Sequence, residues 1–408
     1  MKSQKIINDP VYGFITIPSE LIFTLISHPY FQRLRRIKQL GLTDFVYPGA
    51  LHTRFHHALG AMHLMRVTLD HLRAKGTEIT PEEYEAAIIA ILLHDVGHGP
   101  FSHALEFSIL QGITHEELSL MIMEELNTQH SGQLSLAIRM FTDTYERRFF
   151  HQLVSSQLDI DRLDYLQRDC FFTGVSEGTI GADRIIKMMA IVDDQVVVEE
   201  KGIYSIENFL SARRLMYWQV YLHKTTVSAE KMLINLVRRA QHLGMEGAAV
   251  PATDALAVFL AQPARLQDFK SDPSLLKSFL SLDDYDIWAG VKTWKGSADP
   301  VLRGISQMLL ERNLFKVTLS SQSFSVEELE ALRVKTKKRC GLREEHVDYF
   351  FTHGAISNFA YVAKERILIQ TKKGEIIDVA QAADLPNIKA MSKIVKKYYA
   401  CKAKSLNL

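Results

Sequence analysis

The chain is poor in cysteine and lacks long apolar runs. Its 408 residues include only three cysteines, Cys170, Cys340 and Cys401, and no CxxC pair. This excludes a disulfide framework and favours a reducing cytoplasm. No apolar run approaches the roughly 20 residues that a membrane-spanning helix needs, and no signal-peptide core follows the first residues. We therefore expect a cytoplasmic protein with no membrane partner.

The net charge is also small. A formal value of +1 gives no global argument for nucleic acid, although it leaves room for a local basic groove. A nucleic-acid partner is thus compatible with the composition but not indicated by it. The hydrophobic share of 47% and the charged share of 23% are ordinary for a globular protein. At this length we expect one main domain and a smaller one.

Three common catalytic signatures are absent. The chain contains no GxxxxGKS or GxxxxGKT phosphate loop, no GxSxG elbow and no HExxH helix. The chain is therefore not a phosphate-loop protein, a GxSxG acyl-transfer enzyme or an HExxH zinc protease. What the sequence does have is 16 histidines, many of them between His52 and His115.

Apolar periodicity predicts a mainly helical body followed by a small α+β unit. A short β-hairpin is expected over residues 5–7 and 13–17. Helices are expected over residues 18–26, 31–41, 52–72, 80–95, 116–126, 155–169, 206–243 and across 254–312. After a soft boundary near residue 310, the pattern changes to a strand at 315–319, a helix at 326–338 and a hairpin formed by 366–371 and 375–379. The basic tail at 393–404 is expected to be a solvated helix. The predicted domains are 1–310 and 311–408.

The stretch that carries most chemistry is HDVGHGPFSH, from His94 to His103. It follows an apolar run at residues 86–93, in a helix whose start is marked by Thr80, Pro81 and Glu83 as a capping box. Desolvating an imidazole beside a carboxylate costs several kcal/mol unless a partner compensates, and a divalent metal is one such partner. For His94 and Asp95 alone, a solvated helix end is the commoner explanation.

A metal site needs further ligands from other helices. His57 can bind a metal while Arg54, which shares its helical face, meets an anionic substrate. Asp161 begins a polar stripe that continues through Asp164, Tyr165 and Arg168. An exposed ion-paired face is the usual interpretation of such a stripe, and a further metal ligand is the sharper alternative.

Two other polar segments also allow two interpretations. His115 and Glu116 could shuttle protons beside a metal-bound water, or they could simply begin a helix. The basic residues of segment 31–41 could form a solvated face, which is the commoner case, or a lip above an anionic ligand.

Taken together and in this order, Arg54, His57, His94, Asp95 and Asp161 resemble the H…HD…D signature of the HD-domain phosphohydrolases. Further segments look like the deoxynucleoside triphosphate triphosphohydrolase branch of that family, and they are Ile7–Pro10, Phe31–Leu34, Lys38–Gly41, Pro48–Ala50, His94–His103 and Asp161–Cys170. The resemblance covers residues 5–240.

The resemblance implies a fold, a reaction and a set of site residues. The fold is an HD-domain helical core, and the reaction is water attack at the α-phosphorus of a dNTP, which releases deoxynucleoside and inorganic triphosphate. The implied ligands of a divalent metal (Mg, Mn, Fe, Ni or Zn) are His57, His94, Asp95 and Asp161. The implied catalytic residues are His115, His103 and Glu106, of which Glu106 stands where the family is expected to have aspartate. The implied substrate contacts are Gln39 and Asp169 at the sugar 3′-hydroxyl, Tyr221 at the 2′ position, and Arg54, His98, Arg162, Tyr165, Arg213 and Lys224 around the triphosphate.

A homo-oligomer, either dimer or tetramer, is also implied. Two other functions remain open at this stage. One is an HD-type nucleotide monophosphatase or phosphodiesterase, against which the number of predicted cationic contacts argues. The other is a non-catalytic nucleotide-sensing or nucleic-acid-binding module, against which the complete set of metal ligands argues.

Overall fold

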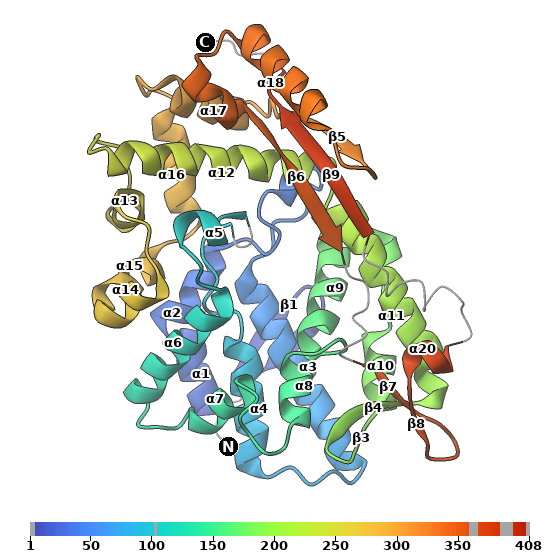
Figure 1. The fold of residues 1–408 in the computed structure, drawn as a ribbon. Helices are drawn as coiled ribbons and strands as arrows, with labels where there is room; N and C mark the ends of the chain where they lie inside the picture. Colours follow the sequence, from blue (N-terminus) through green and yellow to red (C-terminus); the bar gives the residue numbers. More distant parts are fainter. Residues whose placement is uncertain (1–4, 102–103, 359–365, 384–394, 405–408) are drawn as a thin grey trace.

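The computed structural model describes residues 5–101, 104–358, 366–383 and 395–404. Helices dominate it, with a short N-terminal hairpin and small sheets near the C-terminal end (Figure 1). The predicted fold class is therefore confirmed. None of the described helices is both long and apolar enough to cross a membrane.

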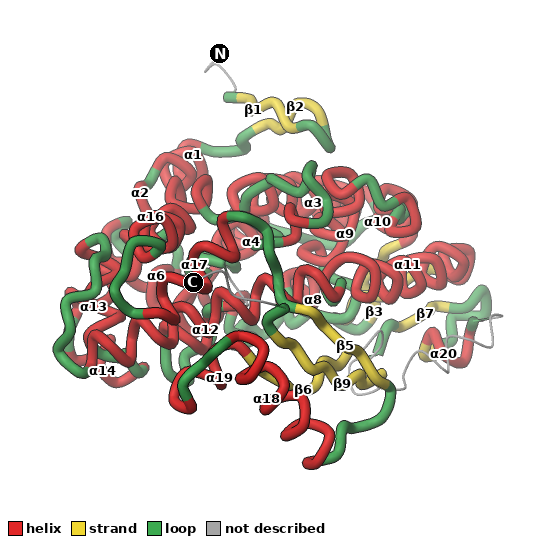
Figure 2. The backbone as a smooth tube through the Cα atoms, turned by 90° about the horizontal axis from the view of Figure 1, so that it is seen from above, coloured by secondary structure: helices red, strands yellow, loops and turns green. Residues whose placement is uncertain are grey.

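The first half of the chain forms a helical body with the hairpin at one edge (Figure 2). Its elements are β1 (Ile6–Asp9), β2 (Gly13–Thr16), α1 (Glu20–Ser27), α2 (Pro29–Gln32), η1 (Arg33–Arg36), η2 (Thr43–Phe45), α3 (Arg54–Ala74), α4 (Pro81–Leu93), α5 (Glu106–Ile109), α6 (His115–Gln129), α7 (Ser135–Phe141), α8 (Phe149–Val154), α9 (Ile160–Thr173), η4 (Ser176–Gly178), α10 (Ala182–Met188), β3 (Met189–Val192), β4 (Gln195–Glu199), η5 (Glu200–Gly202), α11 (Ile203–Met216) and η6 (Tyr217–Tyr221).

The second half packs helices around the long helix α12 (Figure 1). Its elements are α12 (Lys224–Met245), α13 (Asp254–Ala261), α14 (Leu266–Ser271), α15 (Pro273–Ser281), α16 (Asp284–Trp294), α17 (Pro300–Leu310), β5 (Lys316–Ser320), α18 (Val326–Cys340), η7 (Glu344–His346), α19 (Val347–Phe350), β6 (Phe351–Asn358), β7 (Leu368–Gln370), β8 (Ile376–Asp378), α20 (Val379–Ala382) and β9 (Val395–Lys402).

Helix α4 leads directly to the predicted site. The predicted capping box is present, because Glu83 N donates to Thr80 Oγ1 at 3.1 Å and Thr80 N donates to Glu83 Oε2 at 2.8 Å. From Ala86 to Leu93 every residue is buried, so the helix is enclosed on all sides rather than amphipathic. It ends at Leu93, so the polar stretch that begins at His94 starts inside the protein.

The site lies where two hydrophobic clusters meet. Phe55, Val96 and Leu163 belong to one cluster with α3, α4 and α9, whereas Phe101 and Leu118 belong to a second cluster around α12. The loop after α4 passes from the first cluster to the second. Packing on both sides therefore holds its polar groups in place.

The C-terminal segments form two sheets. In one, with strand order β3-β4-β7-β8, β7 runs parallel to β4 and Val197 is opposite Leu368. In the other, with order β5-β9-β6, the tail is the central strand. The expected terminal helix is therefore wrong, because Tyr399, Ala400 and Cys401 are buried between two partner strands. The boundary near 310 stays a prediction, although β7 crosses it to pair with β4.

Two other helical expectations are wrong in part. The predicted helix 31–41 stops at Arg36, after which Ile37 is extended and Lys38 forms a β-bridge with Thr53. The predicted helix 206–243 is interrupted by a π-helical turn at η6 and restarts at Lys224 with the His223 side chain as its N-cap. At both breaks the chain leaves the helical path. Residues beside the candidate site therefore lie where a continuous helix would not have placed them.

Candidate active site

His94 directly follows helix α4 and is its C-cap residue. Its Nδ1 lies 2.6 Å from the carbonyl oxygen of Ile91, and a carbonyl can only accept, so Nδ1 carries the proton. The lone pair of His94 is then on Nε2, which is buried and has no hydrogen-bond partner among the described residues. The helix ends before His98, so a turn, and not a common helical face, relates these two histidines.

His57 is oriented in the same way from α3. Its Nδ1 donates to Asp164 Oδ2 at 2.7 Å, and its buried Nε2 lies 3.1 Å from Asp161 Oδ1 and 3.8 Å from Asp95 Oδ2. A carboxylate on the distal nitrogen is the usual means of fixing the tautomer and orientation of a metal-binding imidazole. The ring is therefore prepared to offer Nε2 as a ligand.

Asp161 completes a compact group of ligands. It lies at the start of α9, where the Asp159 side chain caps the helix by accepting from Arg162 N at 2.7 Å. The ligand atoms of His57, His94 and Asp161 all lie within 4.8 Å of one another. Although burial opposes the charged ring, Asp161 and Asp164 raise the pKa of His57 to about 10. The negative charge that favours a proton on this ring would equally favour a divalent cation in the place of that proton.

Asp95 connects this group to the substrate side. Its carboxylate accepts a short hydrogen bond from Arg54 Nη1, and Oδ1 lies 3.4 Å from both His94 Nε2 and His98 Nε2. Burial raises the pKa of Asp95, but His94, His98 and Arg54 outweigh it and hold that pKa well below its usual range. Asp95 is thus a carboxylate beside both the proposed ligands and Arg54.

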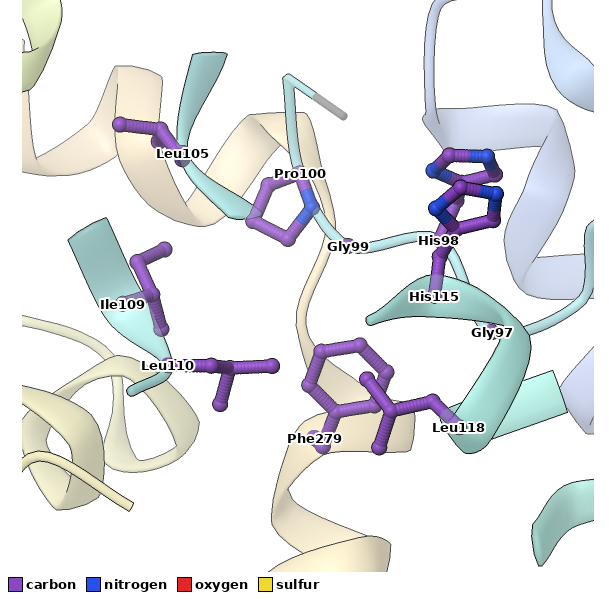
Figure 3. A pocket seen from close by; sticks show the side chains of 10 residues that line it. All are labelled: Gly97, His98, Gly99, Pro100, Leu105, Ile109, Leu110, His115, Leu118 and Phe279. Atoms are coloured by element: carbon purple, nitrogen blue, oxygen red, sulfur yellow. The ribbon is translucent and has the colours of Figure 1, made fainter. Parts of the chain in front are cut away.

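His98 and His115 form a stacked pair on the rim of an apolar pocket (Figure 3). Their ring centroids are 3.8 Å apart with an interplanar angle of 16°. Burial and the charge of Arg54 lower the pKa of His98 well below its usual value, so this ring is neutral. His115 Nε2 lies 3.4 Å from Glu116 Oε1, which brings together the predicted His-Glu pair.

A serine that sequence reasoning missed fixes the turn after α4. Ser119 Oγ donates to the carbonyl oxygen of His94 at 2.7 Å and accepts from Gly97 N at 2.9 Å. A Cβ on Gly97 would lie 2.3 Å from both His115 O and Ser119 N, so only glycine allows this approach. The available signal was a serine one turn after His115, on the buried side of α6.

Replacing Ser119 with alanine is expected to destabilise the protein by about 1–3 kcal/mol, because it leaves two buried backbone groups without a partner. Urea unfolding of the purified chain measures this change. Ser135→Ala is the matched control, since Ser135 is exposed and water can replace its hydroxyl. An unchanged midpoint for Ser119→Ala would show that Ser119 does not hold the turn.

A second group of polar side chains lies around Asp169. One carboxylate oxygen accepts from His52 Nε2 at 2.7 Å, and the other accepts from the Tyr221 hydroxyl at 2.7 Å. His52 stacks on Phe172 with centroids 4.5 Å apart. Gln39 N donates to the carbonyl oxygen of His52 at 3.0 Å, whereas Gln39 Oε1 has no hydrogen-bond partner among the described residues. This group is rigid and retains an acceptor for a ligand.

A cavity of about 470 Å³ joins the two groups. It is lined by ten of the predicted site residues, namely Gln39, Arg54, Asp95, His98, His115, Asp161, Arg162, Tyr165, Asp169 and Tyr221. It is also lined by Leu40, Gly41, Thr43, Phe101, Ala104, Tyr217, Leu222 and Glu230, which sequence reasoning did not assign to the site. A volume of this size is typical of a small-molecule site.

Six predicted residues are not among those that line the cavity. Arg213 is buried and donates to Gln157 Oε1 at 3.0 Å, and Lys224 is exposed at the start of α12. His103 lies outside the described residues, as does the side chain of Glu106, whose backbone begins α5. His57 and His94 adjoin the cavity through their contacts with Asp95 and Asp161.

The polar stripe of α9 faces inward, so its interpretation as an exposed face is wrong. Arg168 is buried and donates to both oxygens of Asp164, at 3.0 and 3.1 Å, and to Asp9 Oδ2 at 2.8 Å. Helix α3 allows this because a Cβ on Gly60 would lie 2.0 Å from Asp164 Oδ1 and 2.1 Å from Arg168 Nη2. Asp9 of the hairpin thereby supports His57 through two intermediates.

The predicted basic segment also contributes support. Arg33 is buried, and its Nη1 donates to the carbonyl oxygens of His98 at 2.8 Å and Leu282 at 3.3 Å. Asp284 at the start of α16 accepts from Lys38 N at 2.9 Å and Phe101 N at 2.8 Å. These bonds attach the segment and the loop after α4 to the second half of the chain. Both interpretations of the basic segment are therefore wrong for Arg33, whose side chain is buried and binds backbone carbonyl groups.

Comparisons with known proteins place this geometry in context. The HD domain family matches residues 54–169, and the HD associated region matches residues 180–261. A phosphohydrolase of Bacteroides thetaiotaomicron VPI-5482 with a solved crystal structure is 51% identical, with a TM-score of 0.94 over 98% of this chain and 99% of its own.

Two curated relatives are more distant. The uncharacterized protein YwfO of Bacillus subtilis is 34% identical over 323 residues, which span 78% of this chain and 72% of YwfO. The deoxynucleoside triphosphate triphosphohydrolase SAMHD1 homolog of Dictyostelium discoideum is 30% identical over 334 residues. That match spans 77% of this chain but only 60% of the relative.

Proposed function

Because this chain belongs to the HD-domain phosphohydrolases, we propose that it hydrolyses deoxynucleoside triphosphates to deoxynucleoside and inorganic triphosphate. One observation carries the proposal: a single cavity connects the candidate metal ligand Asp161 and the cations Arg54 and Arg162 with the polar group around Asp169. The activity after which the Dictyostelium relative is named supports the choice of substrate.

The charges of the cavity suit a polyphosphate. A triphosphate carries about four negative charges, and guanidinium groups bind phosphate through two parallel hydrogen bonds. Arg54 and Arg162 face the cavity beside the ligand group, where a water-poor environment strengthens each contact. Contacts from Arg213 and Lys224 stay predictions.

His57, His94, Asp95 and Asp161 are the residues that would hold a divalent metal. A metal in such a site polarises a phosphoryl oxygen and lowers the pKa of bound water. The proton on Nδ1 of each imidazole is held by Asp164 or by the carbonyl of Ile91, which leaves both Nε2 atoms available. Imidazole and carboxylate ligands suit Mn, Fe, Ni or Zn, and Mg remains compatible.

The other residues bind and orient the nucleotide. His115, paired with Glu116, is the group that would deliver a proton to the departing 5′-oxygen. His98 is neutral, so it would donate a single hydrogen bond to a phosphate oxygen without adding charge. Gln39 Oε1 and Asp169 would accept from the 3′-hydroxyl, and Tyr221, held by Asp169, would crowd the 2′ position of a ribonucleotide.

The experiment that tests this function identifies products and the position of attack. The full chain is incubated with each dNTP and NTP, with Mg²⁺ or Mn²⁺, in water enriched in ¹⁸O. We expect deoxynucleoside without label and triphosphate with one labelled oxygen, from dNTPs in preference to NTPs. Deoxynucleoside monophosphate and pyrophosphate as the only products would overturn the proposal, as would a preference for monophosphates or cyclic nucleotides in the same panel.

Homo-oligomerisation and a cytoplasmic location stay predictions of the sequence. The dimer or tetramer is checked by light scattering of the purified chain at several concentrations. A monomer at micromolar concentration would contradict it.

A further inference from the structure

One carboxylate on the cavity wall takes no part in the steps above. Glu230 lies on α12 and lines the same cavity as Asp161 and Tyr221. Within residues 5–101, 104–358, 366–383 and 395–404, its carboxylate forms no hydrogen bond and no ion pair. A carboxylate that faces a cavity without a protein partner is free to accept from a ligand.

The surroundings of Glu230 are mainly apolar. One part of the cavity wall is apolar. It consists of Leu40 before η2, Phe101 and Ala104 before α5, and Leu222 after η6. Helix α12, which carries Glu230, packs against both η2 and α5. Burial raises the pKa of Glu230 to about 7 despite the opposing charge of Lys231. Keeping a carboxyl group in such surroundings is costly without a hydrogen-bonding partner.

The other parts of a nucleotide already have partners in the cavity. Arg54 and Arg162 face the phosphates, and Gln39, Asp169 and Tyr221 face the sugar. The base is the part of the nucleotide without an assigned partner. We assign it to the apolar wall, because flat hydrophobic contacts suit an aromatic ring. Besides the hydroxyl of Thr43, that wall contains the charged group of Glu230, and this group can contact a base edge.

The chemistry of a carboxylate selects among the bases. Above its raised pKa, Glu230 is ionised, and an ionised carboxylate only accepts hydrogen bonds and binds best to two adjacent N–H donors. Guanine offers such a pair at N1 and the 2-amino group. Adenine and cytosine offer an amino group beside an acceptor nitrogen, and thymine offers one N–H between two carbonyl oxygens that repel a carboxylate.

We propose that Glu230 reads the base of the nucleotide and that guanine is the base it selects. The argument rests on the proposed function for the placement of the phosphates and sugar. The carboxylate, the apolar wall and the shared cavity are independent of the details of catalysis.

The test compares Glu230→Gln with the wild-type chain. Glutamine keeps the size of the side chain, but its amide group points a donor at one of the two guanine donors. We expect wild-type kcat/KM to be highest for dGTP and to fall about tenfold in Glu230→Gln, as for the loss of one bidentate base contact. Values for dTTP should stay within about twofold, and dITP, which lacks the 2-amino group, should be intermediate in the wild type. Glu246→Gln, at the exposed end of α12, is the matched control.

A binding measurement separates failure of this inference from failure of the proposed function. Dissociation constants for dGTP, dATP, dCTP and dTTP are measured with Ca²⁺ by calorimetry for both proteins. Guanine preference in binding that disappears in Glu230→Gln supports the inference even if the hydrolysis products are not those proposed. Equal base ranking in both proteins, by binding and by kcat/KM, overturns it whether or not dNTPs are hydrolysed.

Discussion

Replacing Asp161 with asparagine is expected to lower kcat/KM for dNTP hydrolysis by roughly a thousandfold, as for the loss of several kcal/mol of charge stabilisation by a metal. Asp161 Oδ1 lies 3.1 Å from His57 Nε2 and 3.5 Å from His94 Nε2. Asparagine preserves the shape of the side chain but removes the charge that attracts a cation to these two nitrogens. Metal content should fall in parallel, as measured by elemental analysis of the purified protein.

The control for this variant is Asp183→Asn, which changes an exposed aspartate on α10. It should retain both metal and activity. Thermal unfolding of Asp161→Asn in the presence of a chelator checks that the fold survives, because any difference from wild type under those conditions is independent of metal. Full metal content together with wild-type kcat/KM in Asp161→Asn would exclude it as a ligand.

Replacing Arg168 with methionine is expected to lower the free energy of unfolding by about 3–5 kcal/mol, the usual effect of removing one partner of a buried ion pair. Arg168 is the cation between Asp164 and Asp9, and all three side chains are buried. Methionine fills much of the volume but leaves two buried carboxylates without the cation between them. Denaturant unfolding with a wild-type reference measures the change.

A second readout distinguishes support of the site from general stability. Asp164 also holds Nδ1 of His57, and loss of such outer support typically costs 10–100-fold in metal affinity. We expect a metal titration of Arg168→Met to show a loss of this size. Arg139→Met, which removes an exposed pair with Glu146, should change neither quantity appreciably. An Arg168→Met protein with wild-type stability and metal affinity would refute the supporting role of the network.

Local sequence signals were sufficient for elements whose hydrogen bonds form within a few residues. The capping box of Thr80 and Glu83 marks the start of α4, and the apolar run after it marks a buried helix. The expected helices stopped at residues 169 and 338, whereas Gly174 and Gly341 end them in the left-handed conformation for which glycine is suited. The tail is different. Its lysines suggested a solvated helix. A strand depends on partners, however, and the nearest partner of β9 in the sequence is Asn358 of β6, which lies opposite Val395, 37 residues later.

Some residues of the candidate site could likewise be named from the sequence, and others could not. His57, His94, Asp95 and Asp161 could be named because a metal centre requires these residue types and their order resembles a known signature. Ser119, His52 and Asp9 could not be named, since each acts through a contact with a residue distant in the sequence. Arg213 and Lys224 were expected at the phosphates from the same resemblance, yet they lie off the cavity wall. The resemblance identifies residue types, whereas their distance from a ligand depends on packing.

The chemical groups available to this protein follow from its sequence: imidazoles and carboxylates at the end of a buried helix, guanidinium groups for an anion and tyrosines for a sugar. Which of these groups face one another depends on how the helices pack. Asp164 and Arg168 lie on a stripe that sequence periodicity would place in water, but Gly60 leaves room for both against α3. Helical periodicity shows which residues share a face, whereas burial of that face depends on the residues that another element brings to it.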